Sequence, residues 1–412
     1  MTTLSFSSLG VAEPLARALA AENYLAPTPI QAEAIPLILK GRDVVGIAQT
    51  GTGKTAAFGL PLLQMLAANR VAPAPRSVRA LILAPTRELA IQIDESLRSY
   101  GRHLHLRHAV ILGGISQNKQ VAALRHGVDI LVATPGRLLD LVNQKHVLLG
   151  AVTTLIIDEA DRMFDMGFIR DVRKIVSHIP RQRHGMLFSA TMPADVAHLV
   201  KEMLHDPVRI DISPTAIAAD GIDQRVYFVA TQDKRALLRE LLADKAMKRV
   251  IVFTRTKHGA NKVSEFLGKA GHAADAIHGN KSQGARQRAL EGFRAGRARI
   301  LVATDIAARG IDIDDVTHVI NYELPDVAES YVHRIGRTAR AGSGGTAIAF
   351  CDPSERDSLR AIERLVKREL TTMGGKNRPP EERAAPKQER NYAAPRNRNR
   401  RFRGGRNARY AA

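Results

Sequence analysis

The sequence is poor in the residues that build disulfide frameworks, cysteine-rich metal sites and aromatic surfaces. Its 412 residues include one cysteine and no tryptophan, and aromatic residues make up 4%. A single cysteine excludes a disulfide framework and is typical of a reducing compartment. No apolar run reaches the ~18 residues of a membrane span, and the N-terminal segment lacks the features of a signal peptide. We therefore expect a cytoplasmic protein with an aliphatic core.

Acidic residues are scarce relative to basic ones. Lys and Arg total 61 against 41 Asp and Glu, a formal charge of +20, which predicts a polyanionic partner. Residues 371–412 contain 12 basic and 3 acidic residues and no Leu, Ile or Val. This segment cannot bury enough apolar surface to offset the entropy of ordering it, so we predict a disordered basic tail over 371–412.

The rest of the chain alternates short aliphatic runs with amphipathic stretches. Nine runs are predicted as buried strands, at residues 43–48, 80–84, 129–133, 154–157, 185–188, 249–253, 299–303, 318–320 and 346–350. Helices are expected after Thr86, which is a plausible N-cap, and near Asp233. This alternation predicts an α/β fold of parallel sheets flanked by helices, with ligands bound at the carboxyl ends of the strands. Because residues 213–223 combine turn formers with no strong period, we expect a linker there, between domains at 1–212 and 224–370.

The clearest local motif follows the first predicted strand and reads Ala48, Gln49, Thr50, Gly51, Thr52, Gly53, Lys54, Thr55. It fits the P-loop pattern except that Ala48 replaces the first glycine. Glycines let backbone N–H groups curl around phosphate oxygens, Lys54 brings charge to the β and γ phosphates, and Thr55 offers a hydroxyl to Mg²⁺. The alternative is an ordinary glycine-rich turn between a strand and a helix.

Two carboxylates follow the strand predicted at 154–157. Asp158 and Glu159 would lie at the same sheet edge as the P-loop, because parallel strands deliver their carboxyl ends to one edge. Asp158 would hold Mg²⁺ through water, and Glu159 would orient and deprotonate the attacking water. Acidic residues at a strand end are weak evidence alone, but with the P-loop they predict a nucleoside triphosphatase that uses Mg²⁺.

At Asp158-Glu-Ala-Asp161 the chain resembles the DEAD-box family of ATP-dependent RNA helicases. The resemblance spans about residues 4–368, with the motifs in the family's order. It implies two tandem RecA-like domains, ATP as the nucleotide and RNA as the partner. The segment His278–Arg286 and the short basic tail resemble those of the bacterial RhlE-like members most closely.

The resemblance assigns further residues to the nucleotide. The segment from Tyr24 to Gln31 is similar to the Q motif, in which the Gln reads the adenine edge and an upstream ring, here Phe6, stacks on the base. Asn23 stands where the family usually has Gly. The residues expected to bind ATP are Phe6, Tyr24, Thr28, Gln31, the P-loop residues 48–55 and Asp312, which matches a ribose-binding position.

Other matching motifs imply an RNA grip that depends on phosphates and 2′-hydroxyls, with little sequence specificity. The residues that the resemblance places on RNA are Pro85, Thr86, Arg87, Gly113, Gly114, Thr134, Pro135, Gly136 and Arg137 in the first domain, and Thr254, Arg255, Gln283, Arg286, Thr304 and Asp305 in the second.

The resemblance also implies communication between the domains. Ser189, Thr191, Asp161 and His333 are expected to couple the nucleotide state to RNA-site geometry. From the second domain, Arg334 and Arg337 are expected to act as catalytic arginine fingers when the domains close on ATP. Nearby Ala339 replaces a more usual Gly, a change that is tolerable if the position is helical. ATP binding and hydrolysis would thus close and reopen the cleft between the domains, with local rather than processive unwinding.

Rival functions remain open at this stage. A DNA helicase or translocase would share the P-loop and both domains, although the combined motifs favour RNA. An ATP-gated RNA clamp or scaffold, or a factor for annealing or protein displacement, fits every motif. Ribosomal precursors or an RNA-decay ribonuclease are the expected partners, and the protein is expected to be monomeric. A transporter ATPase is disfavoured because the sequence has no membrane segment.

Overall fold

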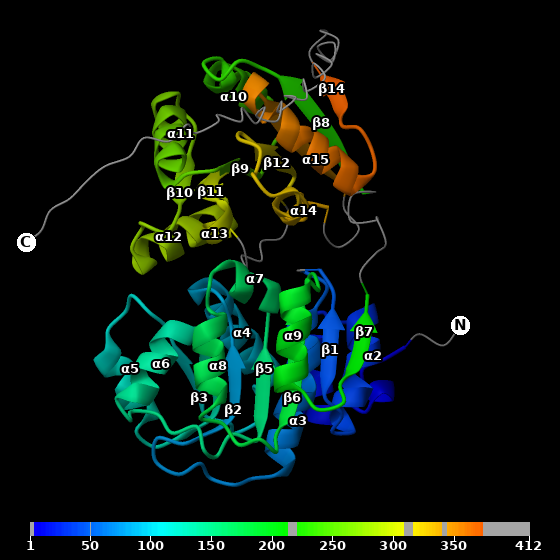
Figure 1. The fold of residues 1–412 in the computed structure, drawn as a ribbon, viewed down its shortest axis with the longest axis vertical. Helices are drawn as coiled ribbons and strands as arrows, with labels where there is room; N and C mark the ends of the chain where they lie inside the picture. The colour runs from blue at the N-terminus through cyan, green and yellow to red at the C-terminus, as the bar shows by residue number, and fades with distance from the viewer. Residues whose placement is uncertain (1–3, 50, 213–220, 309–315, 340–343, 374–412) are drawn as a thin grey trace, which may run out of the picture. The chain divides into compact units, whose positions relative to one another are not determined.

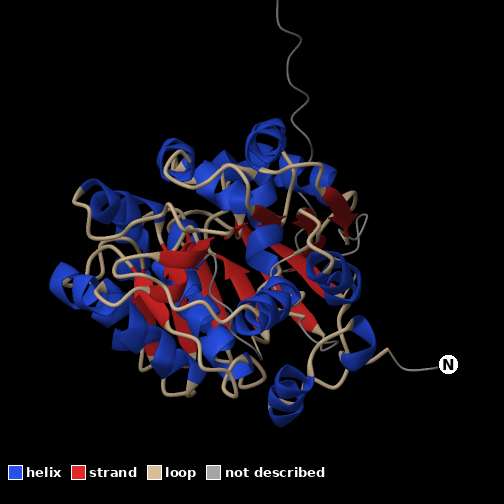
Figure 2. Cartoon of the chain, turned by 90° about the horizontal axis from the view of Figure 1, so that it is seen from below, coloured by secondary structure: helices blue, strands red, loops and turns tan. Residues whose placement is uncertain are grey.

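The computed structural model describes residues 4–49, 51–212, 221–308, 316–339 and 344–373. These residues form two seven-stranded sheets with helices packed against them (Figures 1 and 2). All strand pairs in both sheets are parallel. The α/β class with two parallel sheets is thereby confirmed. In the described part of the chain no helix is long and apolar enough to cross a membrane.

The first sheet has the strand order β3-β4-β2-β5-β6-β1-β7. Its strands are β1 (Val44–Ile47), β2 (Val78–Leu83), β3 (His108–Ile111), β4 (Val128–Ala133), β5 (Thr154–Ile157), β6 (His184–Ser189) and β7 (Val208–Asp211). One apolar core joins the sheet to α1 (Glu13–Ala21), α2 (Pro29–Leu39), α3 (Lys54–Ala68) and α4 (Arg87–Tyr100). A second core joins it to α5 (Gln117–Leu124), α6 (Pro135–Asn143), α7 (Ala160–Asp165), α8 (Ile169–Val176) and α9 (Ala194–Met203). The sheet is therefore covered on both faces.

The second sheet repeats this plan with the order β10-β11-β9-β12-β13-β8-β14. Its strands are β8 (Ile222–Phe228), β9 (Val250–Thr254), β10 (Ala274–Ile277), β11 (Ile300–Thr304), β12 (His318–Asn321), β13 (Gly345–Cys351) and β14 (Thr371–Met373). Its helices are α10 (Lys234–Leu242), α11 (Lys257–Lys269), α12 (Gln283–Arg294), α13 (Asp305–Ala308), α14 (Ala328–Ile335) and α15 (Arg356–Val366). The first two pack in one core, and α12, α14 and α15 contribute to two others.

All nine predicted strands are present, whereas five others, β3, β7, β8, β10 and β14, were not predicted. Four of the five are the edges of the two sheets, and β8 is next to an edge. The β4 and β9 strands are buried at every position, but β3, β7 and β10 alternate or are half exposed. Edge strands need apolar residues on fewer positions, so a search for continuous aliphatic runs misses them.

The two predicted helices are confirmed as α4 and α10. The Thr86 hydroxyl accepts a hydrogen bond from the Leu89 backbone N–H at 3.3 Å, as an N-cap should. The second sheet exceeds the domain predicted at 224–370, because β8 begins at Ile222 and β14 ends at Met373. The remainder of the predicted linker and tail, 213–220 and 374–412, lies outside the described residues, as do Thr50 and Asp312.

Both positions at which the chain departs from a usual family glycine have left-handed backbone. Asn23 has a φ of 59°, and Ala339 has a φ of 55°. Asn adopts this conformation with little strain, but the Cβ of alanine approaches the following carbonyl, a cost of about 1 kcal/mol. The condition under which Ala339 was expected to be tolerated, a helical backbone, is therefore not met.

Candidate nucleotide and RNA site

The P-loop joins β1 to α3 and is shaped by two left-handed glycines. Gly51 and Gly53 both have a φ of 87°, and α3 begins at Lys54. The buried Lys54 ammonium donates a hydrogen bond to the Ala48 carbonyl at 2.8 Å. Burial lowers the pKa of Lys54. In this geometry the lysine is desolvated and held at the loop, ready to exchange a carbonyl for a phosphate oxygen.

The Q-motif glutamine contacts the P-loop directly. The Gln31 side chain accepts a hydrogen bond from the Thr28 N–H at 2.9 Å and donates one to the Gly53 carbonyl at 3.1 Å. A Cβ on Gly53 would lie 2.3 Å from the Gln31 amide nitrogen, so only glycine fits between them. This contact links the segment expected to read adenine with the loop expected to hold phosphates.

The two aromatic side chains expected to contact the adenine, Phe6 and Tyr24, differ in accessibility. Phe6 is 5% exposed and belongs to the apolar core beneath α1 and α2, so the structure does not present its face to a base. The stacking role expected of Phe6 is therefore not supported by this geometry. Tyr24 is 38% exposed, and its hydroxyl lies 3.2 Å from that of Tyr100. Tyr24 is thus the better placed of the two rings.

Asp158 and Glu159 leave the carboxyl end of β5, where α7 begins (Figure 1). Both are 2% exposed. Burial raises the pKa of Asp158 to about 6, although the nearby Lys54 and Arg162 act in the opposite direction. A buried carboxylate that is difficult to ionise would gain from an added cation. The residues present therefore fit Mg²⁺, with Asp158 as the oxygen donor.

Glu159 is held by a residue that the sequence reasoning missed. Its carboxylate forms an ion pair with the Arg162 guanidinium, which is buried one turn further along the chain. Glu159 itself has a left-handed φ of 53°. A strained backbone at a buried acid is common where a reacting group must be aimed. Spacing alone could have suggested this pair, since residues three apart face each other on a helix.

Three of the four residues predicted to couple the sites lie in one hydrogen-bonded cluster. The Ser189 hydroxyl accepts a hydrogen bond from the Asp161 N–H at 3.1 Å. The Asp161 carboxylate accepts bonds from the Thr191 N–H at 3.0 Å and from its hydroxyl at 3.1 Å. His333 lines the same hollow, of about 700 Å³, as Asp161 and Thr191.

Most residues predicted to grip RNA in the first half surround one hollow of about 290 Å³. The Arg87 guanidinium lies over Gly114, where a Cβ would come within 2.2 Å of it, and Arg137 donates a hydrogen bond to the Ile115 carbonyl at 3.2 Å. The hollow is lined by Pro85, Thr86, Arg87, Gly113, Thr134, Gly136 and Arg137, and also by Glu88, Met166, Phe168 and Arg286. Met166 and Phe168 belong to none of the matching motifs, so the sequence did not point to their position here. The buried Pro135 begins α6 beside this set.

Glu88 is a second residue that the sequence reasoning missed. Its carboxylate accepts a hydrogen bond from Gln283 at 3.0 Å and one from Arg286 at 2.8 Å. Gln283 also accepts a long bond of 3.4 Å from Arg87. All of these residues except Arg87 are buried. The structure therefore joins residues of the RNA-motif series from both sheets through one carboxylate.

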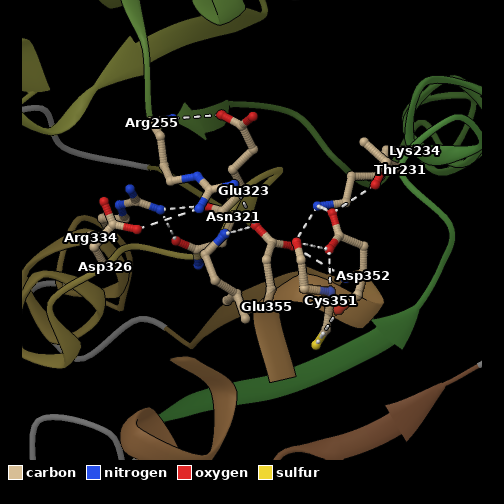
Figure 3. Close-up of polar contacts among 12 residues, drawn as sticks. Thr231, Lys234, Arg255, Asn321, Glu323, Asp326, Arg334, Cys351, Asp352 and Glu355 are labelled. Carbon is tan, nitrogen blue, oxygen red and sulfur yellow. Dashed lines mark hydrogen bonds and ion pairs between the residues drawn. The ribbon is translucent and has the colours of Figure 1, made fainter. Parts of the chain in front are cut away.

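Arg334 is placed differently from its expected catalytic role. Its guanidinium is 1% exposed and forms a two-pronged ion pair with Asp305, at 2.5 and 2.8 Å. It also donates a 3.0 Å hydrogen bond to Asn321 (Figure 3). It also stacks over the Phe253 ring at 5.1 Å. A guanidinium with these partners stabilises the second sheet and is not available to a phosphoryl group. The same ion pair occupies Asp305, which was expected to contact RNA.

Arg337 is better placed than Arg334 for the role of arginine finger. Burial is the main reason why the pKa of Lys54 is lowered, and the positive charges of Arg162 and Arg337 lower it further. Arg337 therefore acts electrostatically on the P-loop lysine. Its side chain is largely buried, with its Nε donating to the His333 carbonyl at 3.2 Å.

The residues at the ends of β9 and β11 that are expected to bind RNA differ in their exposure to solvent. Thr254 is fully buried and its hydroxyl donates to the Thr256 carbonyl at 3.2 Å, and Thr304 is 8% exposed. Their side chains do not present a surface to RNA in this structure. Arg255 is more exposed, and its backbone N–H donates to Glu323 at 2.7 Å while its guanidinium lies 3.6 Å from Glu355 (Figure 3).

The chain matches two family models. The DEAD/DEAH box helicase model matches residues 28–199, and the helicase conserved C-terminal domain model matches residues 233–342. A DEAD-box ATP-dependent RNA helicase named CshA, from Bacillus cereus, is 43% identical over 373 residues, which cover 90% of this chain and 70% of that protein. The Bacillus subtilis CshA is 42% identical over 371 residues, 90% of this chain and 74% of that protein.

Solved structures agree with these relatives. Dbp5 of S. cerevisiae, bound to RNA and ADP BeF3, is 34% identical with a TM-score of 0.81, over 90% of this chain and 95% of that one. The chain therefore belongs to the DEAD/DEAH box helicase family. The two parallel sheets are its tandem RecA-like domains. The narrower resemblance to RhlE-like members finds no support in these relatives, which are named CshA.

Proposed function

We propose that this chain is an ATP-dependent RNA helicase that separates short RNA duplexes locally or remodels ribonucleoproteins. One observation carries the proposal: at the carboxyl edge of the first sheet, a P-loop lysine lies near a buried carboxylate whose pKa is raised to about 6. This is an environment in which a phosphate and a cation would compensate the charges that the protein buries. The family membership supplies RNA as the polymer on which the ATPase acts.

The nucleotide site divides its work among the residues already described. Lys54 would exchange its hydrogen bond to Ala48 for β and γ phosphate oxygens. Thr55 and Asp158 would hold Mg²⁺, which supplies neutralising charge to the phosphates when bound. Gln31, fixed between Thr28 and Gly53, would read the adenine edge beside Tyr24.

Glu159 would orient the attacking water and accept its proton. Its ion pair with Arg162 fixes the direction of the carboxylate, so Arg162 is a positioning residue in this proposal. Arg337 would bring positive charge to the transferring phosphoryl group, a contribution typically worth about 10³ to 10⁵ in rate. Arg334 would act indirectly, by holding Asp305 and the α14 segment in place.

Coupling to RNA would pass through two contacts. The Asp161 cluster ties α7, next to the catalytic acids, to Ser189 and Thr191 at the end of β6. Glu88 is the neighbour of the RNA-motif residue Arg87, and its carboxylate accepts hydrogen bonds from Gln283 and Arg286 of the second domain. ATP and RNA would both favour the arrangement in which these contacts are made, so their binding should be positively coupled.

A pair of variants tests the function. Glu159→Gln should keep ATP and RNA binding but lower RNA-stimulated ATP hydrolysis and duplex separation by about 10² to 10⁴, the usual contribution of a general base. Lys54→Ala should abolish ATP-dependent duplex separation while leaving nucleotide-free RNA binding nearly unchanged. Phosphate release and a labelled duplex report the two activities. If Glu159→Gln retained full biological activity without hydrolysis, the rival ATP-gated clamp would replace the helicase.

Several narrower expectations stay predictions. They are a role with ribosomal precursors or an RNA-decay ribonuclease, annealing or protein displacement as additional activities, a monomeric state and a cytoplasmic location. Assignment to the RhlE-like subgroup likewise rests only on the segment His278–Arg286 and the basic tail.

A further inference from the structure

A hollow of about 740 Å³ runs along one side of α5, at the β3 edge of the first sheet. Figure 1 shows α5 and α6 together at this end of the domain. The helix contributes residues 117, 118, 121 and 122, and Arg125, directly after its last residue, continues the same stripe. Arg76, His126 and His146 complete the basic lining, and of the described residues that line the hollow none is acidic. None of the activities proposed above uses it.

The charge around this hollow is uncompensated. Between residues 96 and 157 the sequence contains seven Lys and Arg but two acids, Asp129 and Asp140. Two of the seven cations, Arg98 and Arg102, pair with Asp94 and Glu22 outside this range. Asp129 is already paired with Arg79 at 2.9 Å in a buried ion pair, and Asp140 lies 3.9 Å from Arg137. Neither acid remains to neutralise the lining. The surface beside α5 therefore carries a positive field that can attract a polyanion.

One of the two lining arginines, Arg76, is fixed by a backbone carbonyl. Arg76 donates to the Lys145 carbonyl at 3.0 Å, which holds its guanidinium in place without cancelling its charge. Arg107 donates to the His126 carbonyl at 3.0 Å and so braces the loop after α5. Arg125 is exposed at the end of the helix. Guanidinium groups held in this way fit phosphate oxygens, which they can bind through two N–H groups at once.

The stripe along α5 begins close to residues that are predicted to bind RNA. Gly113 and Gly114 precede α5 by a few residues, and Arg137 is bonded to the intervening Ile115 carbonyl. The eight residues of α5 span about 12 Å, from the carboxyl edge of the sheet towards the opposite edge. A strand leaving the 290 Å³ hollow beside Gly113 would meet Asn118 first and Arg125 last.

We propose that this α5 groove binds the backbone of the RNA strand that leaves the motif site, adding about two phosphate contacts through Arg76 and Arg125. The inference rests on the proposed RNA-binding function. RNA is favoured over an acidic peptide because α5 begins three residues after Gly114 of the RNA-motif series, and because the groove is lined by Arg, His and amide side chains. It contains one apolar side chain larger than alanine or proline, Val121, and no Phe, Tyr or Trp ring. Contacts made to phosphates would be independent of sequence.

The test uses the full chain carrying Arg76→Gln and Arg125→Gln together. Fluorescence anisotropy would measure binding of a short single strand that fills the motif site, and of the same strand extended at its 5′ or its 3′ end. The double variant should bind the short strand as the unaltered chain does, but lose the extra affinity given by one of the two extensions. For that strand the log–log salt slope should flatten by about 1.4, at about 0.7 for each phosphate contact.

The matched control is Arg181→Gln with Lys201→Gln, which removes the same charge from exposed positions of the same domain. The control should leave both the extension effect and the salt slope unchanged. Equal losses in the control and the test variant would mean that only net charge matters, and would overturn the proposal. The proposal would also be overturned if the double variant kept the extra affinity for the extended strand, including the case in which it lost binding to an acidic peptide instead. A chain without RNA-stimulated ATPase on the short strand would refute the proposed function separately.

Discussion

The two domains bury carboxylates under opposite electrostatic conditions. In the first domain, burial raises the pKa of Asp158 to about 6. In the second, burial also acts on Asp352, but hydrogen bonds from Ser354 and Lys234 outweigh it and hold the pKa of Asp352 well below its usual value. The Asp352 cluster is complete within the chain, whereas the Asp158 site is short of positive charge.

This difference separates a structural from a functional use of buried charge. Lys234 lies 3.1 Å from Asp352 and 2.5 Å from Glu355, and all three are nearly inaccessible (Figure 3). Glu355 also accepts a hydrogen bond from the Leu324 N–H at 3.0 Å. Such a network anchors α10 to the end of β13. At Asp158 the missing charge is what a metal–nucleotide complex would supply.

The largest stability effect is expected from breaking the completed cluster. Lys234→Met would leave two carboxylates buried together, and removal of one partner from a buried ion pair typically costs about 3 to 5 kcal/mol. Urea unfolding followed by circular dichroism would measure the loss. Lys269→Met is the control, because the Lys269 pair with Glu265 is exposed and should contribute little. If Lys234→Met does not fold, Lys234→Arg should still unfold at lower urea than the unaltered chain.

Removing the charge at Asp158 should change the stability in the opposite direction. The pKa of Asp158 in the folded chain, about 6, exceeds the ordinary value of 3.8 for an aspartate. Protonation of Asp158 therefore favours folding fully below pH 3.8, and this contribution is lost as the pH rises through 6. Asp158→Asn should therefore stabilise the nucleotide-free protein at pH 7 by about 1 to 3 kcal/mol. The gain should disappear near pH 4.

Asp352→Asn makes the same chemical change in the second domain and should destabilise the protein at pH 7. Thermal unfolding of both variants across pH would compare them. A loss of stability in Asp158→Asn at neutral pH would show that the first domain compensates its carboxylate internally, and the contrast between the domains would fail.

The smallest effect concerns backbone strain. Both domains contain a left-handed residue in a motif, Glu159 in the first and Ala339 in the second. Ala339→Gly should relieve strain and stabilise the protein by up to about 1 kcal/mol without lowering ATPase activity. Asn23→Gly is the matched control and should change stability by less, since Asn tolerates this backbone. An unchanged unfolding midpoint in Ala339→Gly would contradict the prediction.

The sequence was informative where a residue acts through its immediate neighbours. The central strands, the P-loop geometry and the Thr86 cap all follow from local patterns. Arg334, by contrast, belongs to a matching motif, but its ion pair with Asp305 depends on how β12, α13 and α14 meet. Glu88 was missed for the same reason, because its partners lie nearly two hundred residues away. Tertiary contacts therefore decide which motif residues face a ligand.

The single cysteine has a practical consequence for experiments on this protein. Cys351 ends β13 beside the Asp352 cluster, is 1% exposed, and has its pKa raised to about 12 by burial. At neutral pH its thiol is protonated and shielded, so maleimide dyes should react slowly with the native chain. A cysteine introduced at an exposed position such as Lys119 on α5 could then be labelled selectively, and its fluorescence would report directly when an RNA strand reaches that helix.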